Sequence, residues 1–224
     1  MGDPPNRGAL CLPGAAARPE WVKRSHGRGG LHTTRPTLPR LRQAAQGCQG
    51  CGLFARATQT VFGERPSRAP VMLVGEQPGD AEDKAGSPFV RPAGRMLDRA
   101  MTELAIDRSD VYLTKAVKHF KWLPKGSRRL HKNPSAREVA ACRPWLEAEI
   151  AAIGPSVIVV LGATAGRALL GPSFRVTQQR GQVLPGPNGS VLVPTIHPSA
   201  IVRIRDTCER EEAFRQFVEG LQSA

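Results

Sequence analysis

Short apolar runs alternate with amphipathic stretches along most of the chain from residue 71 onward. Four runs of apolar, partly β-branched residues have the length and continuity of strands buried on both faces of a sheet. They cover residues 71–74, 111–117, 157–161 and 191–196. Apolar residues recur at helical spacing between and after these runs. Helices are therefore expected at residues 93–104, 134–153, 163–170 and 210–221. This order predicts a single α/β domain with a central four-stranded parallel sheet and helices on both faces.

The first part of the chain has a different composition. Residues 1–38 are rich in Pro, Gly and Arg and show no hydrophobic period, which predicts a basic, disordered arm before a folded domain at residues 39–224. No apolar run approaches the ~20 residues of a membrane helix, and the N-terminus has no apolar segment typical of a secretion signal. We expect a cytoplasmic monomer without a membrane partner.

Charge points to a polyanion as partner. The net charge is +13, and seven Lys or Arg residues but no acid lie between Lys115 and Lys132. Such a stretch favours nucleic acid, although a solvated basic face is the alternative. The residues expected to contact DNA phosphates are Arg128, Arg129 and Lys132.

Three groups of polar residues directly follow predicted strands. They are a Gly-Glu-Gln-Pro-Gly-Asp turn at residues 75–80, a basic loop at residues 118–133 and His197. The carboxyl ends of parallel strands share one edge of a sheet, where ligands bind. The sequence therefore predicts a site that combines the turn, the loop and His197. His131, inside the basic loop, is a candidate nucleophile, with a phosphate contact or a solvated position as the alternatives; His197 could instead cap its strand.

The residues of this edge resemble a known family. Residues 75–80, the segment Ser-Pro-Phe-Val at 87–90 and His-Pro-Ser at 197–199 are similar to the iron–sulfur branch of the uracil-DNA glycosylase superfamily. The loop Arg-Arg-Leu-His-Lys at 128–132 resembles that of the X-type members. The likeness covers about residues 45–222. It implies that uracil is excised, preferably from single-stranded DNA, and that His131 then captures the deoxyribose C1′ covalently and without turnover.

The resemblance also implies roles for single residues. Glu76 assists the sugar cation and accepts the imidazole proton, while His197 and backbone N–H groups of the turn stabilise the uracil anion. Phe89 stacks on the extruded base. The further residues expected to bind the base are Gln77, Asp80 and Lys115, and Asp80 has the alternative of fixing the turn. A turnover glycosylase, with uracil or altered base specificity, and a non-catalytic single-strand-binding protein remain alternatives.

Two positions depart from the family pattern. Lys115 stands where the family usually has Asn, and Arg91 where it usually has Gly. An amide both donates and accepts hydrogen bonds, whereas an ammonium group only donates. We therefore expect Lys115 to affect base discrimination, and Arg91 either to extend the DNA groove or to crowd the pocket.

The cysteines predict a metal centre. Five cysteines are an odd number for a disulfide framework, and Cys48 and Cys51 form a CxxC pair, typical of metal or cluster ligation or of redox chemistry. The resemblance implies a [4Fe–4S] cluster held by Cys48, Cys51, His119 and Cys142. Three thiolates and one imidazole also suit zinc, which is the alternative metal, and His119 could instead be a further basic residue that faces DNA. Cys11 and Cys208 have no expected partners.

Overall fold

The structure is a computed structural model that describes residues 37–64, 66, 68–90 and 92–222. The described residues fall within one compact unit, residues 32–224. Most of the predicted basic arm, with Cys11, and also Arg91 lie outside the described residues, so these expectations stay predictions. Within the described ranges, no helix combines the length and the apolar content needed to cross a bilayer.

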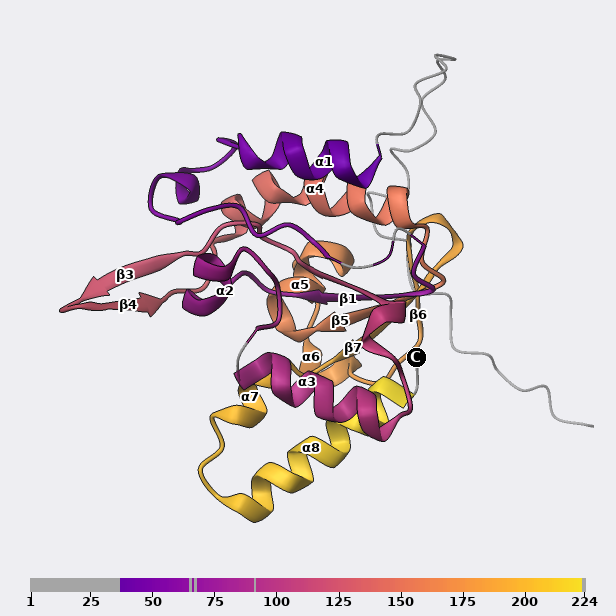
Figure 1. Ribbon diagram of the computed structural model, residues 1–224. Helices are drawn as coiled ribbons and strands as arrows, with labels where there is room; N and C mark the ends of the chain where they lie inside the picture. The colour runs from indigo at the N-terminus through magenta and orange to yellow at the C-terminus, as the bar shows by residue number, and fades with distance from the viewer. Residues whose placement is uncertain (1–36, 65, 67, 91, 223–224) are drawn as a thin grey trace, which may run out of the picture. The chain divides into compact units, whose positions relative to one another are not determined.

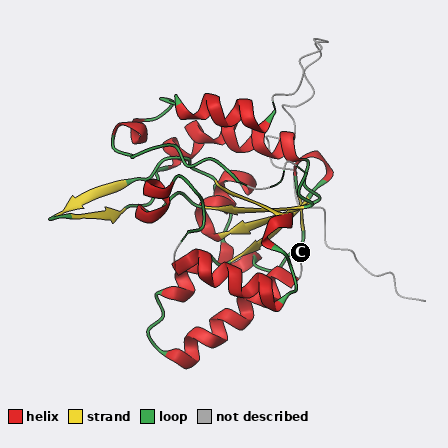
Figure 2. Cartoon of the chain, in the orientation of Figure 1, coloured by secondary structure: helices red, strands yellow, loops and turns green. Residues whose placement is uncertain are grey.

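The core of the fold is a five-stranded sheet in the order β2-β1-β5-β7-β6. Figure 2 draws the strands in yellow among the red helices. Four strands are parallel neighbours: β1 (Val71–Gly75), β2 (Val111–Lys115), β5 (Val157–Leu161) and β7 (Val191–Thr195). These are the four predicted strands, which are confirmed. The fifth, β6 (Leu184–Pro185), runs antiparallel to β7 at the sheet edge. With two residues it is too short to give a sequence pattern.

Helices cover both faces of the sheet, as predicted (Figure 1). One face packs against α4 (Ala136–Ile153) and α5 (Gly162–Leu170), and α1 (Leu38–Gln46) lies on α4. The other face packs against α3 (Pro92–Glu103), α7 (Pro198–Val202) and α8 (Thr207–Gln222). The remaining helices are α2 (Asp80–Ala85), α6 (Val176–Gln179) and the 3-10 turns Gly52–Ala55, Arg108–Asp110 and Pro187–Gly189.

A buried carboxylate fastens the end of β2 to α4. Glu149 is fully buried and accepts hydrogen bonds from the Tyr112 hydroxyl at 2.9 Å, from Thr114 Oγ1 and from Lys118 Nζ. Burial and the neighbouring carboxylate raise the pKa of Tyr112, so its hydroxyl stays a donor. Because a buried charge is costly unless it is paired, this network fixes the strand that ends at Lys115.

The stretch at 118–133 is not an irregular loop, as the sequence suggested, but contains a β-hairpin. Strands β3 (Trp122–Lys125) and β4 (Arg128–His131) pair antiparallel, with Trp122 opposite His131. Gly126 in the tight turn has φ +58°, a conformation that favours glycine. The hairpin places His131 at its base, next to the body of the protein.

Candidate active site

The polar residues of the site gather at the carboxyl edge of the sheet. Glu76 follows β1, Lys115 ends β2, Thr164 lies in the first turn of α5 directly after β5, and His197 follows β7. The hairpin adds His131 from β4. The topology thus brings the predicted turn, the basic segment and His197 to one region of the molecule.

His131 and Glu76 form a hydrogen-bonded pair. Nε2 of His131 lies 3.1 Å from Oε1 of Glu76. The amide nitrogen of Gln77 is 3.2 Å from the same His131 atom, but it is itself a donor and donates to the Lys132 carbonyl. A carboxylate only accepts, so in this contact Nε2 of His131 carries the proton and a neutral ring keeps a lone pair on the other nitrogen. The His131 side chain is 44% exposed, and its ring lies 5.8 Å from that of Phe120. A histidine thus lies at the surface of the site with a base beside it.

Glu76 is held in its charged form. Burial alone raises the pKa of this carboxyl, but hydrogen bonds from His131 and Thr164 and the nearby histidines bring it below the ordinary value. The Thr164 hydroxyl donates to Oε2 of Glu76 at 2.6 Å. The carboxylate is therefore available to balance a positive charge or to take a proton.

His197 presents a buried N–H group without a partner. Its Nδ1 accepts a hydrogen bond from the backbone N–H of Ser199 at 3.1 Å, which leaves the proton of the neutral ring on Nε2. Among the described residues, Nε2 has no hydrogen-bond partner although it is buried. Burial, with the positive charge of Lys115, lowers the pKa of His197 to about 3. A neutral donor that lacks an acceptor suits a ligand oxygen that gains negative charge.

Phe89 is fixed in an unusual backbone conformation. Its φ is +55°, and its N–H donates to Oε1 of Glu82 at 2.5 Å. A Cβ on Gly94 would lie 1.7 Å from the Phe89 carbonyl oxygen, so this close approach requires glycine. The ring is buried and nearly parallel to that of His197, with 6.3 Å between the centroids. Strain of this kind concentrates where a side chain must be held in one place.

Lys115 lies against the same ring. Its Nζ is 3.6 Å from the centroid of Phe89 and 2.9 Å from Oε1 of Glu82, and the side chain is 2% exposed. Glu82 also accepts the N–H of Gly79 at 2.5 Å through its other oxygen. One carboxylate therefore joins the turn after β1, the Phe89 backbone and the end of β2.

The hairpin is anchored by Arg129. Its guanidinium binds Asp80 through Nε at 2.5 Å and Asp83 through Nη1 at 2.6 Å, and it lies over the rings of Phe120 and Trp122. The predicted phosphate contact of Arg129 is thus replaced here by carboxylates of α2. Arg128 and Lys132, in contrast, are exposed.

Asp80 is likewise directed to the hairpin, where it pairs with Arg129, and its expected roles in base binding or in fixing the turn stay predictions. A hydrogen bond from Lys84, at 2.7 Å, and then the pairing with Arg129 lower the pKa of its carboxyl against a smaller effect of burial. The structure therefore brings Asp80 together with Arg129. Gln77 is also turned to the hairpin, where its Nε2 donates to the Lys132 carbonyl at 2.8 Å.

Comparison with known proteins places this geometry in a family. Residues 62–222 match the uracil DNA glycosylase superfamily. A type-4 uracil-DNA glycosylase from Thermotoga maritima is 36% identical over 195 residues, which cover 87% of this chain and 96% of the relative. The type-4 enzyme from Pyrobaculum aerophilum is 35% identical over 173 residues, covering 74% and 85%. This chain belongs to the uracil DNA glycosylase superfamily. The superfamily resemblance is thereby confirmed, while the X-type assignment stays a prediction.

The cysteines of this superfamily member converge from two segments. Cys48 and Cys51 follow α1, and Cys51 packs against the small cluster that contains Cys142 of α4. The Trp145 indole N–H donates to Sγ of Cys48 at 3.1 Å, and the Lys118 backbone N–H to Sγ of Cys142 at 3.2 Å. Such N–H···S bonds stabilise thiolate ligands of a cluster.

The fourth predicted ligand, His119, is turned elsewhere. Its Nε2 lies 2.9 Å from Oγ1 of Thr60, and burial lowers its pKa. Within the described ranges, no set of three His, Cys, Asp or Glu side chains is close enough to hold a metal ion. The three cysteines thus have the chemistry of cluster ligands, but His119 as placed completes neither a cluster nor a zinc site.

Two residues of the site were missed by sequence reasoning. Thr164 follows β5 directly after Gly162, so its position at the sheet edge was a usable signal. Glu82 had only a general signal, an acid in the first turn of a short helix. Its role depends on contacts with Phe89 and Lys115 that no local pattern contains.

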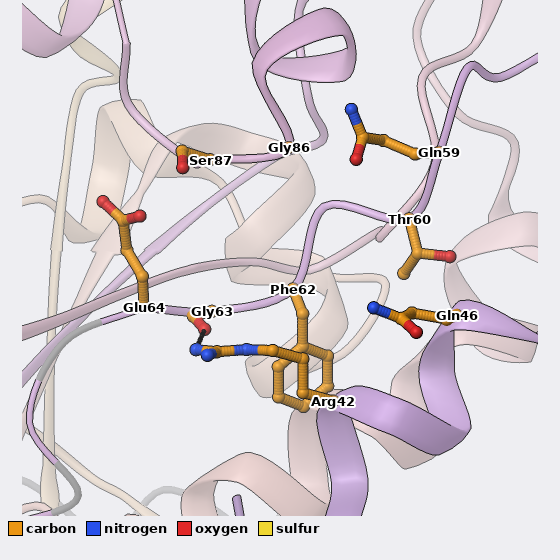
Figure 3. Close-up of a pocket in the computed structure, with 9 residues that line it drawn as sticks. All are labelled: Arg42, Gln46, Gln59, Thr60, Phe62, Gly63, Glu64, Gly86 and Ser87. Carbon is orange, nitrogen blue, oxygen red and sulfur yellow. Dashed lines mark hydrogen bonds between the residues drawn. The ribbon is translucent and has the colours of Figure 1, made fainter. Parts of the chain in front are cut away.

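A cavity of about 210 Å³ lies apart from these residues (Figure 3). It is formed by α1, the segment that precedes β1 and the end of α2. Arg42 crosses it and donates to the Gly63 carbonyl at 2.7 Å. None of the residues placed at the sheet edge lines this cavity, so it has no part in the site described above. Its lining is Arg42, Gln46, Gln59, Thr60, Phe62, Gly63, Glu64, Gly86 and Ser87.

Proposed function

We propose that this chain excises uracil from DNA, preferably single-stranded, and captures the resulting sugar on His131. The observation that carries the proposal is the hydrogen bond of 3.1 Å between His131 and the charged Glu76 at the sheet edge. The carboxylate can take the imidazole proton that such a capture releases. Superfamily membership and the similarity to type-4 uracil-DNA glycosylases support uracil in DNA as the substrate.

The proposed reaction uses groups already in place. The bond between C1′ and N1 of the base breaks, and the base leaves with the electron pair, which the N–H of His197 and backbone N–H groups stabilise. A ring nitrogen of His131 with a free lone pair attacks C1′, and the remaining ring proton passes to Glu76. The attached imidazole is then neutral and a poor leaving group. Positioning beside C1′ lets the imidazole react before water does.

DNA contacts are proposed for two exposed residues of the basic segment that lie near His131. Arg128 begins the strand that carries His131 and Lys132 directly follows it, and both are exposed. Lysine and arginine neutralise phosphates with release of counterions, so binding weakens steeply with salt. Phe89 is proposed to stack on the extruded base. We propose that the protein acts as a monomer in the cytoplasm.

A conventional turnover enzyme is the second candidate. The relatives that match over most of their length are named type-4 uracil-DNA glycosylases. In that case water attacks C1′ and His131 only contacts the DNA. The discriminating observation is the fate of the sugar, not the release of the base.

The test is a denaturing gel of the protein mixed with a labelled single-stranded oligonucleotide carrying one uracil. We expect a shifted band that survives boiling in detergent. His131→Ala should remove this band and leave abasic sites that break in alkali. Lys125→Ala, an exposed change at the hairpin tip, is the matched control and should keep the band. Abasic sites without any shifted band from the parent protein would establish turnover and refute capture by His131.

We also propose a [4Fe–4S] cluster held by Cys48, Cys51 and Cys142, with His119 as the fourth ligand. The N–H···S bonds from Trp145 and Lys118 support this donor set. Ligation by His119 requires that its ring exchange the contact with Thr60 for iron. The cluster would supply a covalent link between the segment after α1 and α4, with no part in the chemistry at C1′.

A further inference from the structure

Lys115 is a buried cation that the proposed reaction does not use. Its side chain is 2% exposed at the end of β2, and its Nζ lies 3.6 Å from the centre of the Phe89 ring. A Cβ on Gly75 would lie only 3.1 Å from the same nitrogen, so the ammonium group rests against the end of β1. The Phe89 ring itself is 1% exposed. The ring on which a base is proposed to stack is therefore already covered, in part by Lys115.

Glu82, the carboxylate that pairs with Lys115, also accepts hydrogen bonds from two backbone N–H groups. Oε1 of Glu82 is 2.9 Å from Nζ of Lys115 and also accepts the Phe89 N–H. Its Oε2 accepts the N–H of Gly79. Separation of Lys115 from Glu82 would leave a charge in a largely buried place, which is unfavourable. Lys115 is thus held over Phe89 by the same group that shapes the turn.

The hydrogen-bonding character of the pocket follows from these contacts. Lys115 Nζ and the unpartnered Nε2–H of His197 are both donors. Uracil presents its N3–H donor between two carbonyl acceptors, so it needs at least one acceptor from the protein. Neither side chain supplies one, and the oxygens of Glu82 already accept other groups. A buried donor without a partner is penalised.

We propose that Lys115 is a specificity-determining residue that covers the stacking face of Phe89 and selects against the hydrogen-bonding edge of uracil. This inference deepens the function proposed above and rests on it. A base enters only when Lys115 leaves Glu82, and uracil then meets donors where it needs an acceptor. The parent protein consequently captures uracil slowly, and an amide at position 115 relieves both restrictions.

The experiment compares two substitutions of similar burial. Lys115→Asn supplies a donor and an acceptor, whereas Lys115→Met keeps the length and removes all hydrogen bonding. Single-turnover release of uracil from a single-stranded oligonucleotide should be about 10- to 100-fold faster in Lys115→Asn than in the parent, the range for one satisfied buried donor. Lys115→Met should show no such gain. An equal gain in both variants would mean that only volume matters and would overturn selection by hydrogen bonding.

A binding measurement tests the role of Lys115 separately from cleavage of the glycosidic bond. The probe is a single-stranded oligonucleotide with one 2′-deoxypseudouridine, whose carbon–carbon glycosidic bond is not cleaved, compared with the same strand carrying 2′-deoxycytidine, whose ring N3 is an acceptor. The preference for the first strand should rise at least 10-fold from the parent to Lys115→Asn, with thermal unfolding recorded as a check of folding. An unchanged preference would overturn the role of Lys115 even if uracil is released. A changed preference without base release would support it and refute the proposed reaction instead.

Discussion

At the scale of single residues, neighbours fix the protonation of the reacting groups. Thr164 and His131 keep Glu76 charged, while burial and the charge of Lys115 keep His197 neutral. Both states suit the proposed reaction, because one group meets a cation and the other meets an anion. A neutral imidazole donates a hydrogen bond without repelling the positively charged sugar.

His197, which is half-buried with its Nε2 out of contact with solvent, makes stability depend on pH. Its pKa is about 3 in the folded protein and ordinarily about 6.5. As the pH falls below about 6.5, the unfolded chain takes up a proton that the folded chain does not, so stability decreases until the pH reaches about 3. At pH 5 this linkage amounts to about 2 kcal/mol. Urea unfolding at pH 7 and pH 5 should show a loss of stability in the parent protein. Between the same two pH values, the loss should be about 2 kcal/mol smaller in His197→Gln. Equal losses in both proteins would contradict the assignment.

At the scale of elements, the strands and long helices could be predicted because their burial is periodic. The parallel strands follow from continuous apolar runs, and α4 from its start at Ser135, whose side chain accepts the Glu138 N–H. The hairpin was missed because β3 and β4 have no apolar alternation. Its inner face is held by Arg129 against α2, about fifty residues earlier in the chain. Tertiary ion pairs of this kind leave no local signal.

Two neighbouring arginines of the hairpin are expected to have different roles, one in anchoring the hairpin and the other in binding DNA. Arg129→Ala removes the partner of the buried Asp83 and should lower the free energy of unfolding by about 2–4 kcal/mol. It should also slow capture, because the strand that carries His131 loses its anchor. Arg128→Ala, on the exposed side, should change stability by less than about 0.5 kcal/mol. It should instead reduce the slope of log affinity against log salt by about 0.7 for single strands.

These two variants are compared by urea unfolding and by fluorescence anisotropy with single-stranded DNA at several salt concentrations. The result that would count against the anchor is a stable Arg129→Ala protein whose salt slope falls as that of Arg128→Ala does. Arg129 would then be a phosphate contact, as the sequence alone suggested.

At the scale of the whole molecule, topology predicted where the site lies but not how its charges pair. Strand order brings the ends of β1, β2, β5 and β7 to one edge, and this could be inferred from the sequence. Whether Lys115 faces DNA, a base or Glu82 depends on side-chain geometry within that edge. The net charge of +13 favours DNA in general. It does not distinguish Arg128, which is exposed, from Arg129, which forms ion pairs with Asp80 and Asp83.

The proposed cluster would hold together two segments that are far apart in the sequence. Cys48 and Cys51 follow α1, whereas Cys142 lies on α4, and α1 otherwise packs there through a small apolar cluster around Leu41 and Ala45. Metal binding of this kind adds directly to folding stability. Cys142→Ser should therefore lose iron and sulfide and unfold roughly 10 °C lower, which corresponds to about 3 kcal/mol for a chain of this length.

Cys208 is exposed in α8 and provides the matched control. Cys208→Ser should keep the iron, the sulfide and the unfolding temperature of the parent. Hydrogen exchange then tests the location of the effect, since residues 38–46 should exchange faster in Cys142→Ser while the parallel strands change little. A Cys142→Ser protein that retains its iron would rule out this ligand set. Loss of iron with unchanged exchange in α1 would show that the cluster does not join the two segments, because its removal would then cost α1 nothing.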